Sequence, residues 1–263
     1  MVTSLAAYKI IVTRPVHQAR KLLSLLKQKG FSVVACPLIR IERIEPDQNI
    51  MKTVAAVMRG ECEWLIFTSA NGVRNLAELQ NRLCMKVVLP EGVRVAAQGW
   101  ATAEAFGSVY GKQVNLIPQV QTGEGLLGEL CKFDLSGKRV VLVQGAGSRQ
   151  TLAMGLRHAG ALVESLVLHR AVSMQMDQHL AAELSKCNRD KLVFLFFSPS
   201  AVRSMAAYDY LLHGSKIAVI GPVTGAAVRE LGYEVFLEAL QQSDEGLVAV
   251  LQKVLSGKVG SLC

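Results

Sequence analysis

Short runs of β-branched and aliphatic residues alternate along the chain with longer segments of helical period. Residues 8–13 predict a strand, and residues 16–29 place apolar side chains on one side of a helix. Gly30 then ends this helix, and residues 31–36 begin the next strand. The alternation predicts βα units and a parallel sheet.

The same succession of elements returns in the middle of the chain. Residues 139–143 predict a strand, residues 149–159 a helix and residues 161–168 a second strand, which follows Gly160. Aligning Gly160 with Gly30 requires no gap. We call this stretch the first type of unit.

A second type of unit also occurs twice. Each copy begins with an apolar strand that leads into a hydroxyl-bearing turn. A second strand follows, which ends in a glycine with a threonine three residues after it. The start of a helix completes the copy. The matched segments are 67–73 with 196–202, 95–102 with 218–224, and 123–127 with 244–248. Landmarks that match in the same order indicate an internal duplication.

Two pairings of these four units could form domains. Neighbouring units could pair from the start of the chain, or the middle two could form one domain while the two chain ends form the other. The segment 127–137 between the middle units is shorter than the bridges at 40–64 and 170–193. Because compact βα units prefer short connections, the second pairing is favoured.

Composition and charge narrow the classes of function. Of 263 residues, 51% are hydrophobic and 19% charged, which is typical of a folded soluble protein, and the length suffices for two domains of about 100–150 residues. The net charge of +8 favours anionic partners. No Lys/Arg block exceeds a pair and aromatic residues do not cluster, so we expect no nucleic acid. A small polyanionic ligand would account for this net charge, and so would a basic surface without a specific partner.

Targeting and metal-binding patterns are lacking. The longest apolar runs, such as 192–197, have strand length, so we expect a cytoplasmic protein without a membrane partner. The cysteines form no C-x-x-C pair and no Cys/His cluster, which predicts no metal site and reduced, mostly buried thiols. They are Cys36, Cys62, Cys84, Cys131, Cys187 and Cys263.

Polar residues at the ends of predicted strands are the candidate binding residues. In a parallel sheet, ligands bind outside the carboxyl ends of the strands, where hydroxyls and free N–H groups at helix starts can hold anions. N-capping alone explains each residue taken singly, but matched pairs favour a site for several carboxylates. The candidates are Thr68, Ser69, Asn71, Thr102, Ser198 and Thr224.

Competing motifs are weak. Residues 145–150 enter a helix and Glu164 lies near the spacing of a ribose partner, but Gln150 replaces the third glycine of the dinucleotide fingerprint. The turn at Arg14 in the matching unit has no glycine. Nucleophile elbows, Walker loops and H-E-x-x-H motifs do not occur, so no cofactor is expected. Only His169 ends an apolar strand; the other histidines lie in polar helical stretches and are expected to be exposed.

Taken together, the matched segments resemble the uroporphyrinogen-III synthases. Segments 67–73, 197–202 and 220–224 and the Gly99–Thr102 turn agree with that family's pattern in order and spacing, and the likeness runs from Ile10 to about Leu251. The individual motifs are short. Their ordered set carries the specificity.

The resemblance implies two flavodoxin-like α/β domains with parallel sheets, joined by a two-stranded linker. The first domain is then discontinuous, with residues 1–37 and 172–263, and residues 38–171 form the second with linker segments at both ends. It also implies the substrate hydroxymethylbilane, cyclised in a cleft between the domains with loss of water and inversion of ring D. A transient contact with the preceding pathway enzyme is a further expectation.

Residue roles follow from the same resemblance. Thr68, Ser69, Thr102, Ser198 and Thr224 match positions that bind carboxylates or line the cleft. His169 stands where many members have a tyrosine proposed to help the hydroxyl leave. A histidine there could donate a proton, more readily below neutrality. Further departures are Trp100 in place of a usual proline and Gly225 in place of a usual alanine.

Two alternatives remain at this point. A non-catalytic, two-lobed cytoplasmic protein that binds a small anion would share the fold. An inactive paralogue would share the fold as well, and His169 in place of tyrosine is compatible with it. The products formed from hydroxymethylbilane would discriminate among the three hypotheses.

Overall fold

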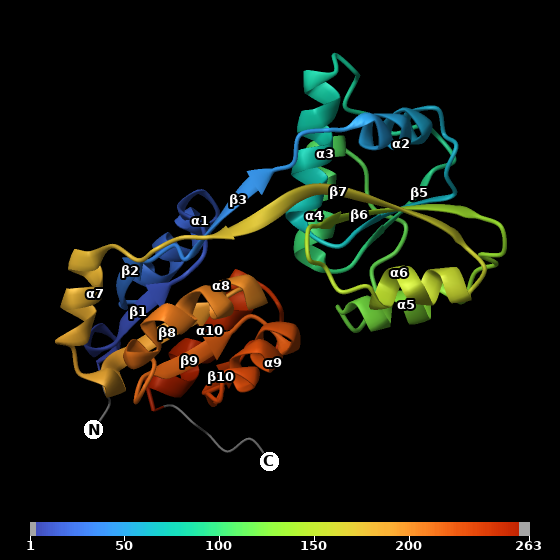
Figure 1. The fold of residues 1–263 in the computed structure, drawn as a ribbon. Coiled ribbons are helices and arrows are strands. Elements are labelled where there is room, and N and C mark those ends of the chain that lie inside the picture. Colours follow the sequence, from blue (N-terminus) through green and yellow to red (C-terminus); the bar gives the residue numbers. More distant parts are fainter. Residues whose placement is uncertain (1–3, 258–263) are drawn as a thin grey trace. The chain divides into compact units, whose positions relative to one another are not determined.

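Two strands join two separate α/β units in this chain (Figure 1). The structure is a computed structural model and describes residues 4–257, so Cys263 lies outside the described residues. Unit 1 contains the chain up to Ile41 and again from Val172, and unit 2 is Glu42–Ala171. The division falls within strands β3 (Ile39–Arg43) and β7 (Leu162–Ser173).

Unit 1 is built on a five-stranded sheet in the order β2-β1-β8-β9-β10. All its neighbouring strands are parallel, and the order is that of flavodoxin-like folds. Aliphatic and aromatic residues fill the inner strands, which are buried on both faces as parallel strands require. The strands are β1 (Lys9–Val12), β2 (Ser32–Ala35), β8 (Leu192–Phe196), β9 (Lys216–Val219) and β10 (Leu237–Glu238).

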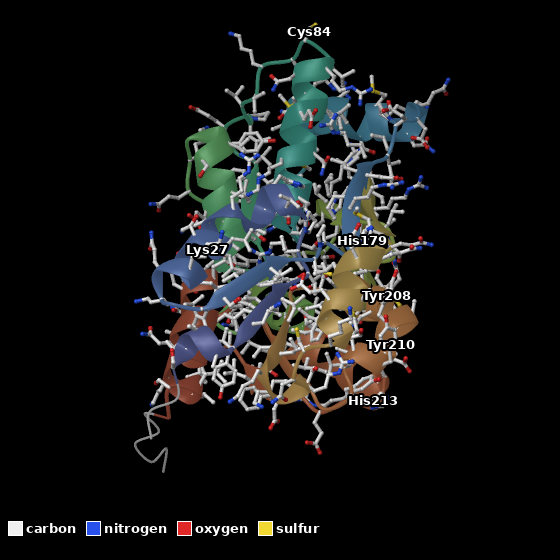
Figure 2. All side chains as sticks on the ribbon, turned by 90° about the vertical axis from the view of Figure 1, so that its left-hand side faces the viewer. Lys27, Cys84, His179, Tyr208, Tyr210 and His213 are labelled. Carbon is white, nitrogen blue, oxygen red and sulfur yellow. The ribbon has the colours of Figure 1, made fainter. Side chains whose placement is uncertain are left out.

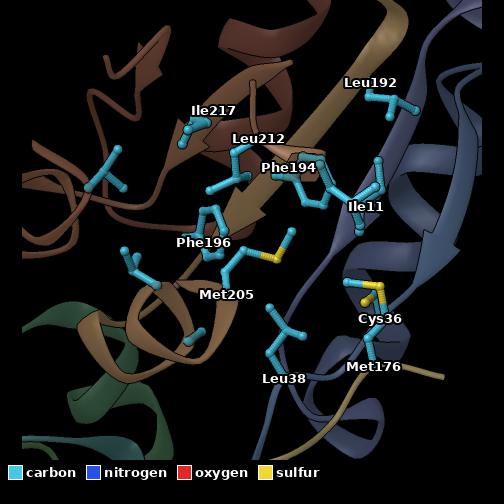
Figure 3. Packing of buried hydrophobic residues seen from close by; sticks show 14 of the residues in the cluster. Ile11, Cys36, Leu38, Met176, Leu192, Phe194, Phe196, Met205, Leu212 and Ile217 are labelled. Atoms are coloured by element: carbon cyan, nitrogen blue, oxygen red, sulfur yellow. The ribbon is translucent and has the colours of Figure 1, made fainter. Parts of the chain in front are cut away.

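Helices cover both faces of the unit 1 sheet. Because side chains alternate along a strand, Ile10 and Val12 pack with α1 (Val16–Gln28) and α10 (Asp244–Leu255) on one face. The other face packs against α7 (Gln178–Ser185), α8 (Pro199–Met205) and α9 (Pro222–Glu230). Figure 3 shows Phe194, Phe196 and Met205 in this second cluster. Short 3₁₀ helices are η1 (Leu5–Ala7), η2 (Arg189–Lys191) and η3 (Ala206–Leu211).

Unit 2 has a sheet in the order β3-β7-β6-β4-β5. Strands β4 (Trp64–Phe67), β5 (Arg94–Ala97), β6 (Arg139–Gly145) and β7 pair in parallel, and a parallel bridge joins Ala96 to Leu116 beyond β5. One face carries α2 (Gln48–Met58), α3 (Ala70–Arg82) and α4 (Trp100–Tyr110). The other carries α5 (Gly123–Leu130) and α6 (Thr151–His158), which pack together (Figure 1).

The two sheets repeat one topology in a rotated chain order. Strands β7-β6-β4-β5 of unit 2, followed by the bridge at Leu116, correspond to β2-β1-β8-β9-β10 of unit 1. The duplication therefore appears as two equivalent folds, one of which is built from both ends of the chain. The predicted fold class, two similar α/β domains with parallel sheets, is confirmed.

The linker strands carry the same repeat. Ile44 N donates to Leu168 O at 3.0 Å, and Met174 N donates to Leu38 O at 2.8 Å. The alignment of Gly30 with Gly160 places Leu38 on Leu168 and Ile44 on Met174, so the two hydrogen bonds are equivalent. The strand predicted at 161–168 is longer than expected because it continues into this linker as far as Ser173.

The cysteine prediction is partly wrong. Cys36 and Cys62 are buried, and burial raises the pKa of the Cys36 thiol to about 12 and that of Cys62 to about 11. Cys84 and Cys131 are exposed because they lie just past the ends of helices α3 and α5. Within residues 4–257, no helix is long and apolar enough to cross a membrane.

Candidate functional site

Each sheet has one pair of neighbouring strands whose following helices leave toward opposite faces. In unit 1 the pair is β1 and β8, which lead into α1 and α8 on different faces. In unit 2 it is β6 and β4, which lead into α6 and α3. The crevice outside the carboxyl ends of such a pair is where ligands bind in open parallel sheets.

The predicted residues Thr68, Ser69 and Asn71 follow β4 at this crevice of unit 2. Thr68 Oγ1 donates to Val143 O at 3.3 Å and so ties β4 to β6. Ser69 Oγ accepts from Gly72 N at 3.2 Å as the N-cap of α3. A hydroxyl that accepts a cap bond keeps its own proton to donate, whereas the proton of Thr68 is already used. Ser69 is therefore the better donor to an anion.

The side chain of Asn71 lies in the first turn of α3, and its backbone carbonyl accepts from Asn75 Nδ2 at 2.7 Å. An Asn amide offers two donors, which suits a carboxylate. Ser198 repeats the role of Ser69 in unit 1, since its Oγ accepts from Ala201 N at 3.3 Å at the start of α8. The turns after β4 and β8 thus match in function as well as in sequence.

Thr102 and Thr224 form a second matched pair, each the third residue of its helix. Their exposed fractions are only 5% and 4%. Both helices start from a glycine N-cap, Gly99 in α4 and Gly221 in α9. The hydroxyls therefore lie at the carboxyl edges of the two sheets but close to the interior of each unit.

Two glutamines that we did not predict pack against these glycines. A Cβ at Gly99 would lie 2.6 Å from Gln121 Oε1, and one at Gly221 would lie 2.8 Å from Gln242 Cδ. Gln121 Oε1 also accepts from Trp100 N at 3.0 Å. The sequence does indicate that the two glutamines are equivalent. Segments 121–126 and 242–247 have Gln, Glu, Gly and Leu at the same positions, and each has a hydroxyl residue, Thr122 or Ser243, as the helix N-cap.

Arg14 is a further residue that the prediction missed. Its Nη1 lies 2.9 Å from Asp244 Oδ1, and its guanidinium carbon lies 4.0 Å from the centre of the Phe197 ring. The two charged side chains are about one-fifth exposed, at 21% and 16%. Arg14 thus brings a partly buried positive charge to the crevice between β1 and β8.

His169 alone among the five histidines is buried, with an exposed fraction of 6%. It lies opposite Gly145 of β6, and its buried Nδ1 has no hydrogen-bond partner among the described residues. Burial lowers the pKa of His169, so the imidazole is neutral at neutral pH. The other four, including His179 and His213 in Figure 2, are exposed as expected.

The structure gives no support to a dinucleotide site at residues 145–150. Ser148 Oγ donates to Gly145 O at 2.7 Å, which closes the loop on itself. Glu164, the candidate ribose partner, accepts from Arg139 and from Thr53 at the opposite end of the sheet. In the described part of the chain, no group of His, Cys, Asp and Glu side chains could hold a metal ion.

Comparison with known proteins identifies the family. The family model described as Uroporphyrinogen-III synthase HemD matches residues 20–249. The chain belongs to the uroporphyrinogen-III synthase family. Membership of this family places it among lyases of tetrapyrrole biosynthesis.

Individual relatives agree with the uroporphyrinogen-III synthase assignment. The uroporphyrinogen-III synthase of Synechococcus elongatus is 26% identical over 93% of this chain and 94% of its own length. That of Chlorobaculum parvum is 24% identical over 86% and 90% of the two chains. A crystal structure of a mutant uroporphyrinogen III synthase from Thermus thermophilus has 19% identity and a TM-score of 0.64, covering 96% of this chain and all of that one. It shows the same fold.

Proposed function

We propose that this chain is a uroporphyrinogen-III synthase, which cyclises hydroxymethylbilane with loss of water and inversion of ring D. The observation that carries the proposal is the presence, in a member of this family, of matched polar turns at the carboxyl edges of both sheets. Hydroxymethylbilane carries eight carboxylates, and a chain of net charge +8 with hydroxyl donors at such turns suits it.

The proposed reaction needs positioning more than acid–base power. The terminal hydroxyl takes up a proton from solvent and leaves as water, which gives an azafulvene cation, because the electron-rich pyrrole expels its own leaving group. Attack by the substituted carbon of ring D gives a spiro-pyrrolenine, which fragments and recloses with that ring inverted, and the final closure returns one proton to solvent. An unguided bilane closes at the other carbon, so the protein must hold ring D in the productive geometry.

Polar residues at the carboxyl edge of each sheet are the candidate carboxylate ligands in this proposal. Ser69 and Ser198 have protons to donate, and Asn71 adds an amide beside Ser69. Thr102 and Thr224 supply a matched hydroxyl pair, and Thr68 positions the turn by its bond to Val143. Arg14 adds a charge that is already oriented by Asp244.

His169 would assist departure of the hydroxyl from its position beside Gly145. Because burial lowers its pKa, we expect the neutral ring to donate a hydrogen bond and not the imidazolium to transfer a proton near neutrality. This revises the expectation that protonation below neutrality would favour the role. We place no cofactor in the reaction, and we retain a cytoplasmic location and transient contact with the preceding enzyme as parts of the proposal.

One assay tests the activity. The chain is supplied with hydroxymethylbilane, the products are oxidised, and the type I and type III isomers are separated. We expect type III in excess. Only type I, as without enzyme, would contradict the proposal and favour an inactive paralogue. Tight binding of simple sugars, amino acids or phosphates in calorimetry would instead favour a two-lobed binding protein.

A further inference from the structure

The indole of Trp100 is exposed at the edge of unit 2 that carries the candidate site. The chain has two tryptophans, of which Trp64 is 1% exposed and Trp100 is 61% exposed. Trp100 is the first residue of α4, two positions before Thr102. Val120, next to the glutamine that binds the Trp100 backbone, is also 64% exposed. Two large apolar side chains therefore adjoin the polar turns.

The backbone that carries this indole is fixed from two sides. Gln121 Oε1 accepts from Trp100 N at 3.0 Å, and the same oxygen approaches Gly99 so closely that a Cβ there would lie 2.6 Å away. The N-terminal residue of a helix commonly has an unpaired N–H, and here that group is bound. The indole is thus presented from an anchored backbone, which lowers the entropy lost when a ligand packs on it.

The matched turn of unit 1 has no aromatic residue at this position. Pro222 follows Gly221 where Trp100 follows Gly99, and Gln242 packs on Gly221 as Gln121 packs on Gly99. The glycine, the glutamine and the threonine are common to both turns. The aromatic ring belongs to one turn alone.

We propose that Trp100 packs against a pyrrole ring of hydroxymethylbilane and fixes the direction in which the bilane binds. This rests on the proposed function. The pyrroles of the bilane have apolar aromatic faces and carry carboxylates at their edges. The exposed indole can pack against a face while the neighbouring hydroxyl donors bind the carboxylates. Trp100 belongs to one turn alone, so the pyrrole that packs on it is distinguished from the other rings of the bilane, since aromatic pairs gain beyond area burial.

The test uses tryptophan emission and isomer analysis on the full chain. Because Trp64 is buried, a change in emission on rapid anaerobic mixing with hydroxymethylbilane should come from Trp100 and should be lost in Trp100→Phe. We expect Trp100→Ala to raise KM about two- to tenfold and to raise the share of type I product, while Trp100→Phe keeps most of the affinity.

Leu162→Ala provides the matched control. Leu162 is 62% exposed and begins β7 at the opposite edge of the same sheet, so its removal should leave KM and isomer ratio unchanged. Thermal unfolding of each variant checks folding. An unchanged KM and isomer ratio in a folded Trp100→Ala variant would overturn the inference about Trp100. Absence of type III product with the unaltered chain would instead reject the proposed function itself.

Discussion

The ring of His169 packs directly against Gly145 of the neighbouring strand. The two residues are register partners at the carboxyl end of β6, where the pairing with β7 shifts between Gln144 and Gly145. A Cβ at Gly145 would lie 2.9 Å from His169 Nε2, closer than such atoms normally approach. Glycine is therefore required at position 145 if the imidazole is to keep its place.

Gly145→Ala should destabilise the chain by about 1–3 kcal/mol, the usual cost of overpacking a buried site. The measurement is urea unfolding of the single variant, of His169→Ala and of the double variant. Because the clash needs both side chains, the double variant should lose less than the sum of the single losses. Additive losses would show that the ring does not occupy the space above Gly145.

His169→Phe should lower turnover of hydroxymethylbilane by less than about a hundredfold. General acid catalysis is typically worth about 10²–10⁴-fold, and a neutral ring that only donates a hydrogen bond should contribute less, because the pyrrole supplies most of the driving force. Phenylalanine keeps the ring beside Gly145 and removes only the nitrogens. Complete loss of type III product from a folded variant would mean that the imidazole does more than assist.

The same replacement should change how stability depends on pH. Burial lowers the pKa of His169 in the folded state below the value of about 6.5 that it has in the unfolded chain. At pH values between these two pKa values, the unfolded chain binds a proton that the folded chain does not. Stability is then unaffected above that range and falls as pH drops through it, by at most about 1.4 kcal/mol per pH unit. Urea unfolding at pH 7.5 and pH 5.5 should show a smaller loss in His169→Phe than in the unaltered chain.

The matched threonines should be equivalent in substrate binding. Thr102→Val and Thr224→Val each remove a hydroxyl at nearly constant volume, and a lost hydrogen bond to a charged group should cost about 10–150-fold in kcat/KM. Steady-state kinetics with isomer separation would measure it. Thr102→Ser and Thr224→Ser keep the hydroxyl and should retain most activity. An effect confined to one unit would argue against carboxylate binding by both turns.

Two matched glycines at the starts of α5 and α10 should tolerate no side chain. A Cβ at Gly125 would lie 2.1 Å from Val120 O, and one at Gly246 would lie 2.5 Å from Gln241 O. Each alanine variant should lose about 3 kcal/mol in urea unfolding, because the backbone must move. Gly128 of the same helix α5 has no atom within 4 Å of a Cβ, so Gly128→Ala should instead gain about 0.5–1 kcal/mol.

The repeat could be read from sequence because its signs are local. Strand runs, glycine helix ends and hydroxyl-bearing turns each depend on a few neighbouring residues, and the same order of signs appears twice. The caps at Ser69 and Ser198 follow from the same local rules. The topology agrees with that reading, since both sheets show one strand order.

Contacts between distant residues could not be read in this way. Arg14 and Asp244 are 230 positions apart, so neither residue alone indicates an ion pair over Phe197. Gln121 lies between two elements in sequence, and no neighbouring residue indicates that its side chain packs on Gly99. These contacts depend on how the sheets bring strand ends together, which is a property of the packed fold and not of a segment.

The sequence by itself determined the elements, their duplication and the family, because local propensity and ordered motifs are properties of short stretches. Only the tertiary structure decided which polar groups still have protons to donate, and how far His169 is buried. Hydrogen-bond use and burial depend on neighbours brought from elsewhere in the chain. Thr68 shows the difference, since the sequence predicts it as a residue of the binding site and the fold adds that its hydroxyl donates to Val143 O.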